Sequence, residues 1–400
     1  MRRVWAVCVL ASVAAGCGGE AEAPAETMQD GALSEASNEV RHAQHFELSR
    51  RDGYTVVRTF GEITSFQTKD EGTPVQDVTV LVPRGHEPPV LEGELAGAYV
   101  VEVPARSVAV NNDDLMTFVI ELGASDRLVA VGGFYTYDDA IRDAVERDAL
   151  GELGYSWHLP PDMEVLLTRD PEIAFMGMDA PDNVPALQRS RELGIGAVPA
   201  FVWAERDPLA RAEWIKFFGA FLGLDDEARE LFDGIESRYM ALKARTAAVV
   251  DSPSVLWGYH AGDDRWFMMT NNIESRLVRD AGALGVLTDH EGPVRYDGSE
   301  FASEAVLVAG AEADHWVIGD IHQNALPPTA FMNEFHSYRE DALYHNYART
   351  KWDVNAYDWY EGGVVRPDDI LADLIHLFHP ELSPDRELVF MGHFDKEVGR

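Results

Sequence analysis

The segment of about residues 207–250 constrains the fold most, because it is the longest stretch with helical periodicity and no strand signal. Asp207 followed by Pro208 is typical of a helix start, since aspartate accepts the first free N–H groups and proline has no N–H to leave unpaired. Apolar residues continue to Gly223, where the pattern predicts the end of this helix. Asp225 then begins a second helix of roughly 24 residues, about 35 Å long, which is the width of a small domain.

Strand and helix patterns alternate on both sides of this helical block. Three short runs between residues 46 and 103 predict an antiparallel meander, and strands alternate with helices from residue 107 to 206. A β-branched and aromatic run at residues 254–259 starts a similar pattern after the block. We therefore predict an α/β fold: two α/β lobes with mainly parallel sheets, joined by one long helix, with a ligand cleft between the lobes. One large α/β domain with a peripheral helix is the alternative.

The first residues have the features of an export signal. Arg2 and Arg3 precede an apolar run that is too short to anchor stably across a bilayer, and small residues lead to Cys17. This ending is similar to the bacterial lipobox, in which the cysteine is lipidated; an ordinary secretory peptide with a chance cysteine is the alternative. The only other cysteine, Cys8, falls in the segment that would be removed, so the mature chain would have no disulfide.

Composition predicts where the remaining parts of the chain begin and end. Residues 18–44 contain mainly Ala, Glu, Ser and Gly with hardly any large apolar side chain, which predicts a disordered tether. The rest of the chain is long enough for two cores of ordinary size. The predicted parts are a signal peptide with its lipobox (1–17), the tether (18–44), an N-terminal lobe (45–206), the linker helices (207–250) and a C-terminal lobe (251–400).

The chain is strongly acidic. It has 33 Lys and Arg residues against 69 Asp and Glu residues, which gives a formal net charge of −36. Because the phosphates of nucleic acid would be repelled by such a surface, nucleic acid is excluded as a partner. The acidic side chains themselves are interpreted as a solvated surface.

Several strings in the chain carry a family resemblance. They are, in order, residues 121–131 (ELGASDRLVAV), 211–217 (RAEWIKF), 279–283 (RDAGA), 313–317 (ADHWV), 367–374 (PDDILADL) and 379–382 (HPEL). Together with the lipobox and the two-lobed pattern, they resemble the solute-binding lipoproteins of ABC importers for iron-siderophores, haem and cobalamin. The resemblance covers about residues 46–382, and neither composition nor periodicity shows it.

The resemblance implies a non-catalytic receptor in the cell envelope, anchored by lipid on Cys17 to the outer side of a bacterial membrane and therefore periplasmic. It implies no cofactor, and the ligand would be an iron or cobalt chelate. The partners would be an ABC permease and its ATPase, and a monomer is expected.

The resemblance also implies one acidic docking residue on each lobe for the permease. The family's first-lobe glutamate falls at Thr117 in this chain, which is a departure from the pattern. Glu121 is the predicted substitute, with Asp113 and Asp114 as the alternatives. Glu274 is the predicted docking residue of the second lobe.

The ligand is expected where strands end, because ligands of parallel sheets bind at the carboxyl ends of the strands. A bulky, partly anionic chelate needs flat aromatic surface for contact and arginine for its acidic groups. Core packing is the alternative role for each aromatic side chain. The predicted ligand-binding residues are Tyr135, Trp203 and Arg206 from the first lobe and Tyr259, Trp266 and His322 from the second.

One motif favours an enzyme instead. Asp320 and His322 follow a predicted strand, which resembles the first metal-binding motif of metallophosphoesterases. The Gly-Asn-His and Gly-His-x-His motifs that a dinuclear site also needs do not occur in the sequence, and neither do the P-loop, Gly-x-Ser-x-Gly and His-Glu-x-x-His patterns. We therefore predict a binding protein, with a metal-dependent phosphoesterase as the alternative.

Overall fold

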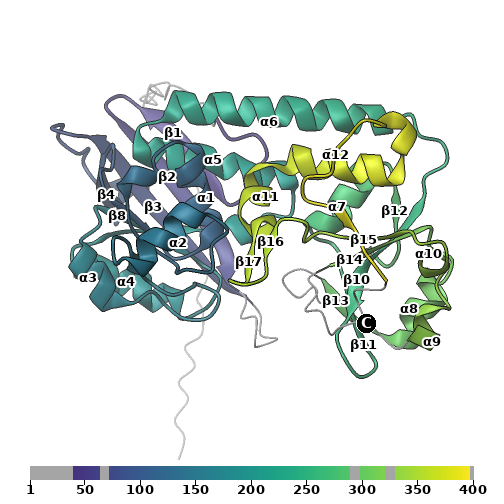
Figure 1. The fold of residues 1–400 in the computed structure, drawn as a ribbon. Helices are drawn as coiled ribbons and strands as arrows, with labels where there is room; N and C mark the ends of the chain where they lie inside the picture. The colour runs from purple at the N-terminus through teal and green to yellow at the C-terminus, as the bar shows by residue number, and fades with distance from the viewer. Residues whose placement is uncertain (1–38, 64–71, 289–297, 320–328, 397–400) are drawn as a thin grey trace, which may run out of the picture. The chain divides into compact units, whose positions relative to one another are not determined.

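We describe the fold from a computed structural model of the chain (Figure 1). It describes residues 39–63, 72–288, 298–319 and 329–396. The predicted lipidation site Cys17, and the pair Asp320 and His322, lie outside the described residues. Their roles therefore stay predictions from the sequence.

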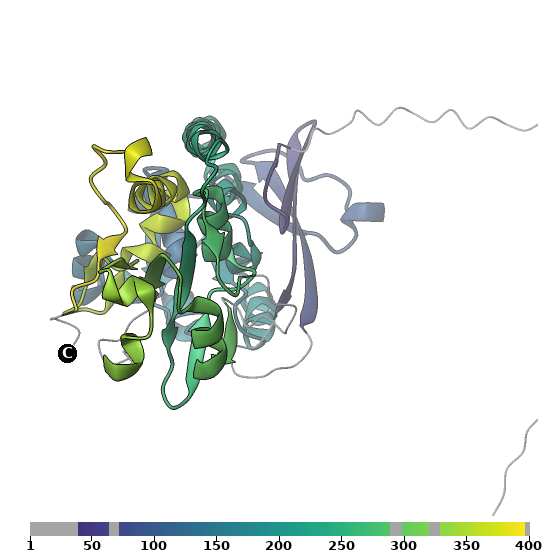
Figure 2. The same cartoon turned by 90° about the vertical axis from the view of Figure 1, so that its right-hand side faces the viewer.

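An N-terminal sheet comes first in the chain, and Figure 2 shows its purple strands as a layer at one side of the described residues. Its strands pair in sequence order, antiparallel except for the last pair, which is parallel. The predicted antiparallel meander is therefore wrong for that last pair. Residues 84–98 form a connection long enough to return the chain to the start of the preceding strand. The strands are β1 (Phe46–Arg51), β2 (Tyr54–Ile63), β3 (Thr73–Pro83) and β4 (Tyr99–Val103).

The sheet of the first lobe is parallel throughout, as predicted. Its order is β7-β6-β5-β8-β9, so the chain leaves the central strand β5 in one direction and later continues on its other side. Such a reversal of strand order opens a crevice at the carboxyl ends of the strands. The strands are β5 (Val108–Val110), β6 (Leu128–Val131), β7 (Gly151–Glu152), β8 (Ile173–Gly177) and β9 (Gly196–Ala200); the helices are α1 (Asp113–Glu121), α2 (Asp139–Glu146), α3 (Met163–Arg169) and α4 (Asn183–Glu192).

The two central helices are present as predicted, α5 at Pro208–Leu222 and α6 at Asp225–Thr246. The Asp207 carboxylate accepts hydrogen bonds from the first free N–H groups of α5, and Gly223 ends that helix in the left-handed conformation. Nearly every residue of α5 is buried, so this helix belongs to the core and has no solvent-facing side. Helix α6 extends along both lobes (Figure 1).

The sheet of the second lobe is parallel at its centre and antiparallel at its edges. Its order is β13-β11-β10-β14-β15-β18, with β12 paired to β10. The strands are β10 (Ser254–His260), β11 (Arg265–Met268), β12 (Leu284–Gly285), β13 (Ser299–Ala302), β14 (His315–Ile318), β15 (Leu343–His345) and β18 (Gly392–His393), with a separate hairpin of β16 (Thr350–Lys351) and β17 (Ala356–Tyr357). The helices are α7 (Ile273–Asp280), α8 (Ser303–Gly310), α9 (Thr329–Met332), α10 (His336–Arg339), α11 (Gly362–Val365) and α12 (Pro367–Phe378).

The segment just before β1 is held on the first lobe. The buried carboxylate of Glu213, on α5, accepts hydrogen bonds from the backbone N–H groups of Arg41, His42 and Ala43 and pairs with Lys216 at 2.7 Å. Residues 39–44 were assigned to the disordered tether because of their composition, and for these residues that assignment is wrong. Hydrogen bonds to a distant carboxylate order them in place of apolar burial.

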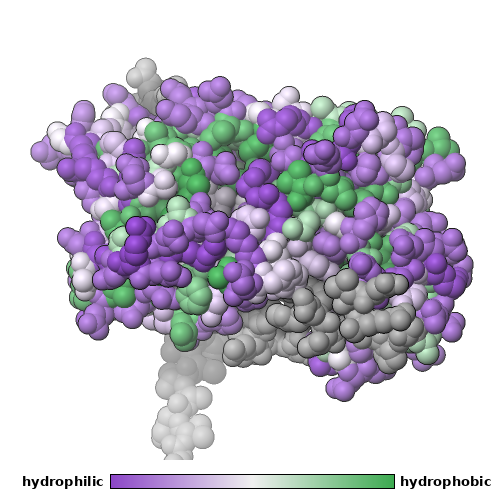
Figure 3. Space-filling view, viewed as in Figure 1, coloured by the Kyte–Doolittle hydropathy of each residue, from purple (hydrophilic) through white to green (hydrophobic). Residues whose placement is uncertain are grey.

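The fold class is the predicted one: two α/β lobes with mainly parallel sheets and a long helix between them. The lobe boundaries at residues 45, 206 and 251 stay predictions. Hydrophilic residues cover most of the face shown in Figure 3, as the net charge of −36 leads one to expect.

Candidate ligand cavity

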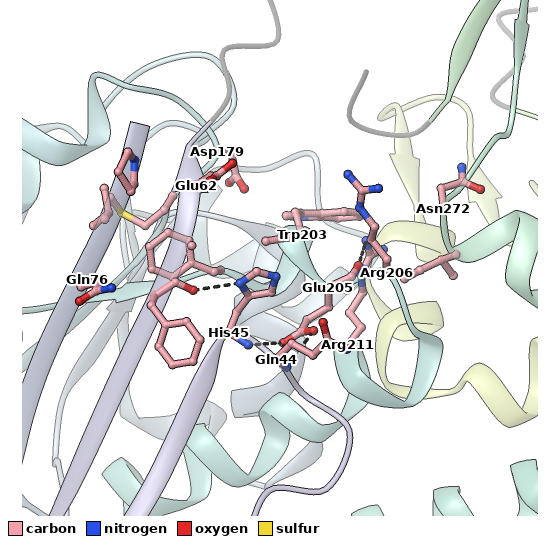
Figure 4. Close-up of a pocket in the computed structure, with 18 residues that line it drawn as sticks. Gln44, His45, Glu62, Gln76, Asp179, Trp203, Glu205, Arg206, Arg211 and Asn272 are labelled. Carbon is pink, nitrogen blue, oxygen red and sulfur yellow. Dashed lines mark hydrogen bonds between the residues drawn. The ribbon is translucent and has the colours of Figure 1, made fainter. Parts of the chain in front are cut away.

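A cavity of about 510 Å³ lies at the carboxyl ends of β8 and β9 (Figure 4). Residues 44–45 together with β2 and β3 form one wall, and Asn272 and Ile273 at the start of α7 contribute from the second lobe. Gly61 lets β2 approach the base of the cavity, because a Cβ atom there would come within 2.5 Å of the Phe201 ring. The cavity therefore joins the N-terminal sheet, the first-lobe crevice and the second lobe.

Trp203 provides the flat surface of the cavity. It lies in a short 3-10 turn, Val202–Ala204, directly after β9. The Arg211 guanidinium lies 4.1 Å from the centre of its ring, and the Tyr360 ring centre lies 6.0 Å away. Arg211 also donates to the Glu205 carbonyl at 3.3 Å, which fixes the guanidinium over the indole.

Glu205 is almost fully buried beneath the cavity and holds its wall. Its carboxylate accepts hydrogen bonds from the backbone N–H groups of Gln44 and His45 and from Trp214 Nε1, at 2.9 to 3.1 Å. Burial raises the pKa of Glu205, while nearby His45 and these hydrogen bonds oppose that rise. The residue thus acts as a fixed support for the segment that carries His45.

Asp179, at the cavity edge, begins a row of buried carboxyl groups. Asn112 Nδ2 donates to it at 3.0 Å and Ser156 Oγ donates to the same oxygen. Burial raises the pKa of Asp179 to about 6, although both donors lower it. Its negative charge in turn raises the pKa of Asp114, in the first turn of α1, which burial has already raised well above its ordinary value.

The row continues through Asp113 to Glu361 of the second lobe. Burial raises the pKa of Asp113 well above its ordinary value, and Glu361 and Asp114 add to the rise. Burial also raises the pKa of Glu361 to about 8. Asp113 and Asp114, the alternatives for the first-lobe docking acid, are both buried, which does not fit a residue that must reach a partner protein.

Glu361 forms the contact that joins the lobes beside this row. Its carboxyl accepts a hydrogen bond from the backbone N–H of Tyr137 at 2.6 Å and lies 2.8 Å from Thr136 Oγ1. The second-lobe residue Lys351 donates to the Tyr137 carbonyl at 2.8 Å and lies 4.4 Å from the centre of the Tyr137 ring. Arg349 lies 5.0 Å from the same ring. We call Tyr137, Lys351 and Glu361 the interlobe contact.

Two of the predicted ligand-binding residues, Trp203 and Arg206, line the cavity. Tyr135 does not line it; its ring is 44% exposed and packs against Phe134 and Tyr155. Tyr259 also lies outside the cavity lining, partly buried with its ring centre 5.6 Å from that of Phe267.

Trp266 is a core residue, so its assignment to the ligand site is wrong. It is fully buried among Trp316 and Phe335, and its Nε1 donates to Ser303 Oγ at 3.2 Å. The side chains of a strand alternate between two faces, and the pairing of β11 with β10 and β13 turns this indole toward the helices of the second lobe.

Four further residues line the cavity but were not among the predicted ligand-binding residues: His45, Glu205, Arg211 and Asn272. His45 follows a segment assigned to the tether, and its supporting residue Glu205 is 160 residues away in the sequence. Arg211 stood in one of the strings of the family resemblance, which was a signal that could have found it. Asn272 is the N-cap of α7, which explains its presence without any ligand.

The docking assignments stay predictions. Glu121 is partly exposed at the end of α1 and lies 3.8 Å from Arg366 of the second lobe. Glu274 is partly buried in the first turn of α7. Thr117 is buried and donates to the Asp113 carbonyl at 3.1 Å, so it cannot replace the family's glutamate at a surface.

Within residues 39–63, 72–288, 298–319 and 329–396, no three His, Cys, Asp or Glu side chains are grouped so that they could hold a metal ion. In the same ranges, no helix is both long and apolar enough to cross a membrane.

Two α/β lobes, one long helix and a cavity at the strand ends define a two-lobed solute-binding protein. A model of the periplasmic binding protein family matches residues 108–324, more than half of the chain. The chain belongs to this family, whose members are solute-binding proteins and not enzymes. The N-terminal sheet precedes the matched residues, so the wall formed by β2 and β3 lies outside them.

Solved structures share the fold. The periplasmic haem-binding protein RhuT from Roseiflexus sp. RS-1 is 18% identical, with a TM-score of 0.50 over 70% of this chain and 100% of that one. A periplasmic haem-binding protein from Pseudomonas aeruginosa is 18% identical, with a TM-score of 0.52 over 73% and 99%. A TroA-like periplasmic binding protein from Xylanimonas cellulosilytica is 13% identical, with a TM-score of 0.54 over 80% and 99%.

A curated relative is an uncharacterized lipoprotein of Methanocaldococcus jannaschii, 23% identical over 244 residues. The match covers 59% of this chain and 55% of the relative. The chain thus spans about half the length of the curated relatives it matches.

Proposed function

We propose that this protein is the extracytoplasmic receptor of an ABC importer and that it captures a metal chelate, such as an iron-siderophore, haem or cobalamin. The observation that carries the proposal is the cavity at the ends of β8 and β9, where Trp203 offers aromatic surface and Arg206 and Arg211 offer positive charge. A negative chelate needs both, and positive charge is scarce in a chain with a net charge of −36. The names of two structures with the same fold, both haem-binding proteins, support this ligand class.

Titration of the purified protein with a panel of chelates tests the proposal. The panel comprises haemin, a ferric hydroxamate siderophore, a ferric catecholate siderophore and cyanocobalamin, followed by calorimetry. We expect micromolar or tighter binding of one chelate class, since cavities of this size bury most of a small ligand. Binding of none of the four, by protein whose far-UV spectrum shows it to be folded, would contradict the proposal.

Attachment to the membrane through Cys17 is part of the same proposal. The lipobox in the sequence supports it, and so does the name of the curated relative, which is a lipoprotein. In a bacterial host the protein should enter the detergent phase, because several acyl chains together give stable anchoring. The Cys17→Ala variant should stay in the aqueous phase; equal partitioning of the two proteins would exclude the anchor. The partner would be a permease with its ATPase, and the acids Glu121 and Glu274 would contact it.

A further inference from the structure

The His45 imidazole is fixed on the wall of the cavity. Its Nδ1 lies 2.9 Å from the backbone carbonyl oxygen of Phe60, on β2. A carbonyl oxygen can only accept a hydrogen bond, so Nδ1 carries the proton in this contact. A neutral ring then has its lone pair on Nε2, the ring nitrogen that takes no part in the contact with Phe60.

The backbone of His45 is fixed as well. Its N–H donates to the buried carboxylate of Glu205 at 3.0 Å, and the preceding N–H of Gln44 donates to the same group. Glu205 is itself held by Trp214 Nε1 at 3.1 Å. Ring and backbone are therefore held by two separate elements, β2 and the segment after β9, before any ligand arrives. This is the arrangement of metal-binding histidines, whose second nitrogen usually donates to a carbonyl or carboxylate.

The surroundings of Nε2 suit a flat chelate. Among the described residues, His45 Nε2 has no hydrogen-bond partner, and the ring lines the cavity together with Trp203, Arg206 and Arg211. One histidine cannot hold a bare metal ion, and the described residues contain no group of three ligands. A tetrapyrrole supplies four ring nitrogens and leaves an axial position open, so one histidine is enough.

We propose that His45 Nε2 coordinates the metal of a bound iron tetrapyrrole. This rests on the proposed function and narrows its ligand class to chelates with an open axial position. The Nε2 lone pair forms the bond to ferric iron and a water ligand leaves, with no change of oxidation state. Trp203 contacts the face of the macrocycle, and Arg206 and Arg211 pair with its carboxylates. A hexadentate ferric siderophore has no position for His45 and is outside this proposal.

Two probes separate coordination from packing: haemin and metal-free protoporphyrin IX, which has the same ring and carboxylates. Each is titrated into the full-length protein and into His45→Ala. We expect His45→Ala to weaken haemin binding about tenfold or more and to shift the Soret band, because the axial ligand is lost. Metal-free protoporphyrin should bind both proteins within about twofold, since its contacts do not include a metal bond. Added imidazole should return the Soret band of the variant toward that of the parent protein.

His42→Ala is the matched control. This nearby histidine lies 2.5 Å from Glu236 Oε1, packs against Phe232 and does not line the cavity, so its loss should leave haemin binding unchanged. If His45→Ala fails to fold, His45→Gln replaces it, because its amide can still donate to the Phe60 carbonyl.

Three outcomes would overturn the proposal in distinguishable ways. If the His45 variant and the parent protein have the same haemin affinity and the same Soret band, His45 does not coordinate the iron, and the proposed receptor function is unaffected. If the parent protein binds a ferric siderophore but no haemin, the proposal of a tetrapyrrole ligand is wrong and the proposed receptor function still holds. A parent protein that binds no chelate of the panel would remove both.

Discussion

The cavity and the interlobe contact differ in how fully their polar and charged side chains are bound within the protein. At the cavity, Arg206 is exposed and His45 keeps one ring nitrogen without a protein partner in the described residues. At the interlobe contact, Lys351 and Glu361 are both bound to the same loop of the first lobe, around Tyr137. The difference supports the proposal that the cavity takes a ligand from outside, while the contact joins the two lobes to each other.

The largest expected effect is on stability, from Tyr137→Ala. The substitution removes a partly buried ring that lies against Lys351 and Arg349. We expect the free energy of unfolding to fall by about 2 to 3 kcal/mol in urea denaturation. Haemin affinity should change less than about twofold, because Tyr137 does not line the cavity. A large loss of affinity without a loss of stability would reverse the roles assigned to the two regions.

A pH dependence is expected at Glu361. The folded chain holds its proton up to about pH 8, whereas the unfolded chain releases it near the ordinary value of 4.5, because burial opposes the charged form. Its contribution to stability is therefore full below the unfolded value and is lost as the pH rises through the folded one. The parent protein should lose unfolding free energy continuously between pH 5 and pH 8.

Glu361→Gln should reduce that loss. Glutamine can still accept the hydrogen bond from the Tyr137 N–H through its amide oxygen, but it has no titratable proton. Part of the dependence of stability on pH should remain, because the pKa values of Asp113 and Asp114 are also raised in the folded chain. Urea denaturation of the parent protein and of the variant at pH 5 and at pH 8 measures this change in the free energy of unfolding. Parallel slopes for the parent protein and the variant would show that Glu361 is already ionised in the folded chain.

The smallest expected effect is that of Arg206→Ala. This exposed side chain should contribute about 1 kcal/mol to the binding of an acidic chelate, or about fivefold in affinity, and more at low salt. Stability should not change. Calorimetry with haemin at two salt concentrations checks this, with Arg189→Ala, an exposed arginine at the far end of α4, as the control. An effect that is the same at both salt concentrations would argue against charge pairing with the ligand.

The sequence predicts features whose chemistry is local. Asp207 and Gly223 mark the ends of α5 because a cap and a left-handed glycine act within one turn. Trp203 and Arg206 were found because they directly follow a parallel strand. Trp266 also lies in a strand, yet the neighbours of β11 decide which face is buried, and a single strand does not contain that information.

Long-range partners explain the remaining errors. His45 depends on Glu205, and Thr136 depends on Glu361 across 225 residues. Residues 39–44 were predicted to be disordered because they contain few apolar side chains. They are ordered by hydrogen bonds to the carboxylates of Glu213, on α5, and Glu205, both of which are distant in the sequence. Asp113 and Asp114 are likewise buried because α11 of the second lobe packs against α1. The sequence around the two aspartates does not show this contact.

The central claim is that the chelate binds at Trp203 and not at the exposed aromatic group around Tyr135. Calorimetric titration with haemin of Trp203→Ala and Trp157→Ala tests it most directly, because Trp157 is 41% exposed, stacks on Tyr155 and does not line the cavity. We predict that Trp203→Ala weakens binding about tenfold or more while Trp157→Ala stays within about twofold of the parent protein. A loss confined to Trp157→Ala would place the ligand at the other aromatic group and contradict the account.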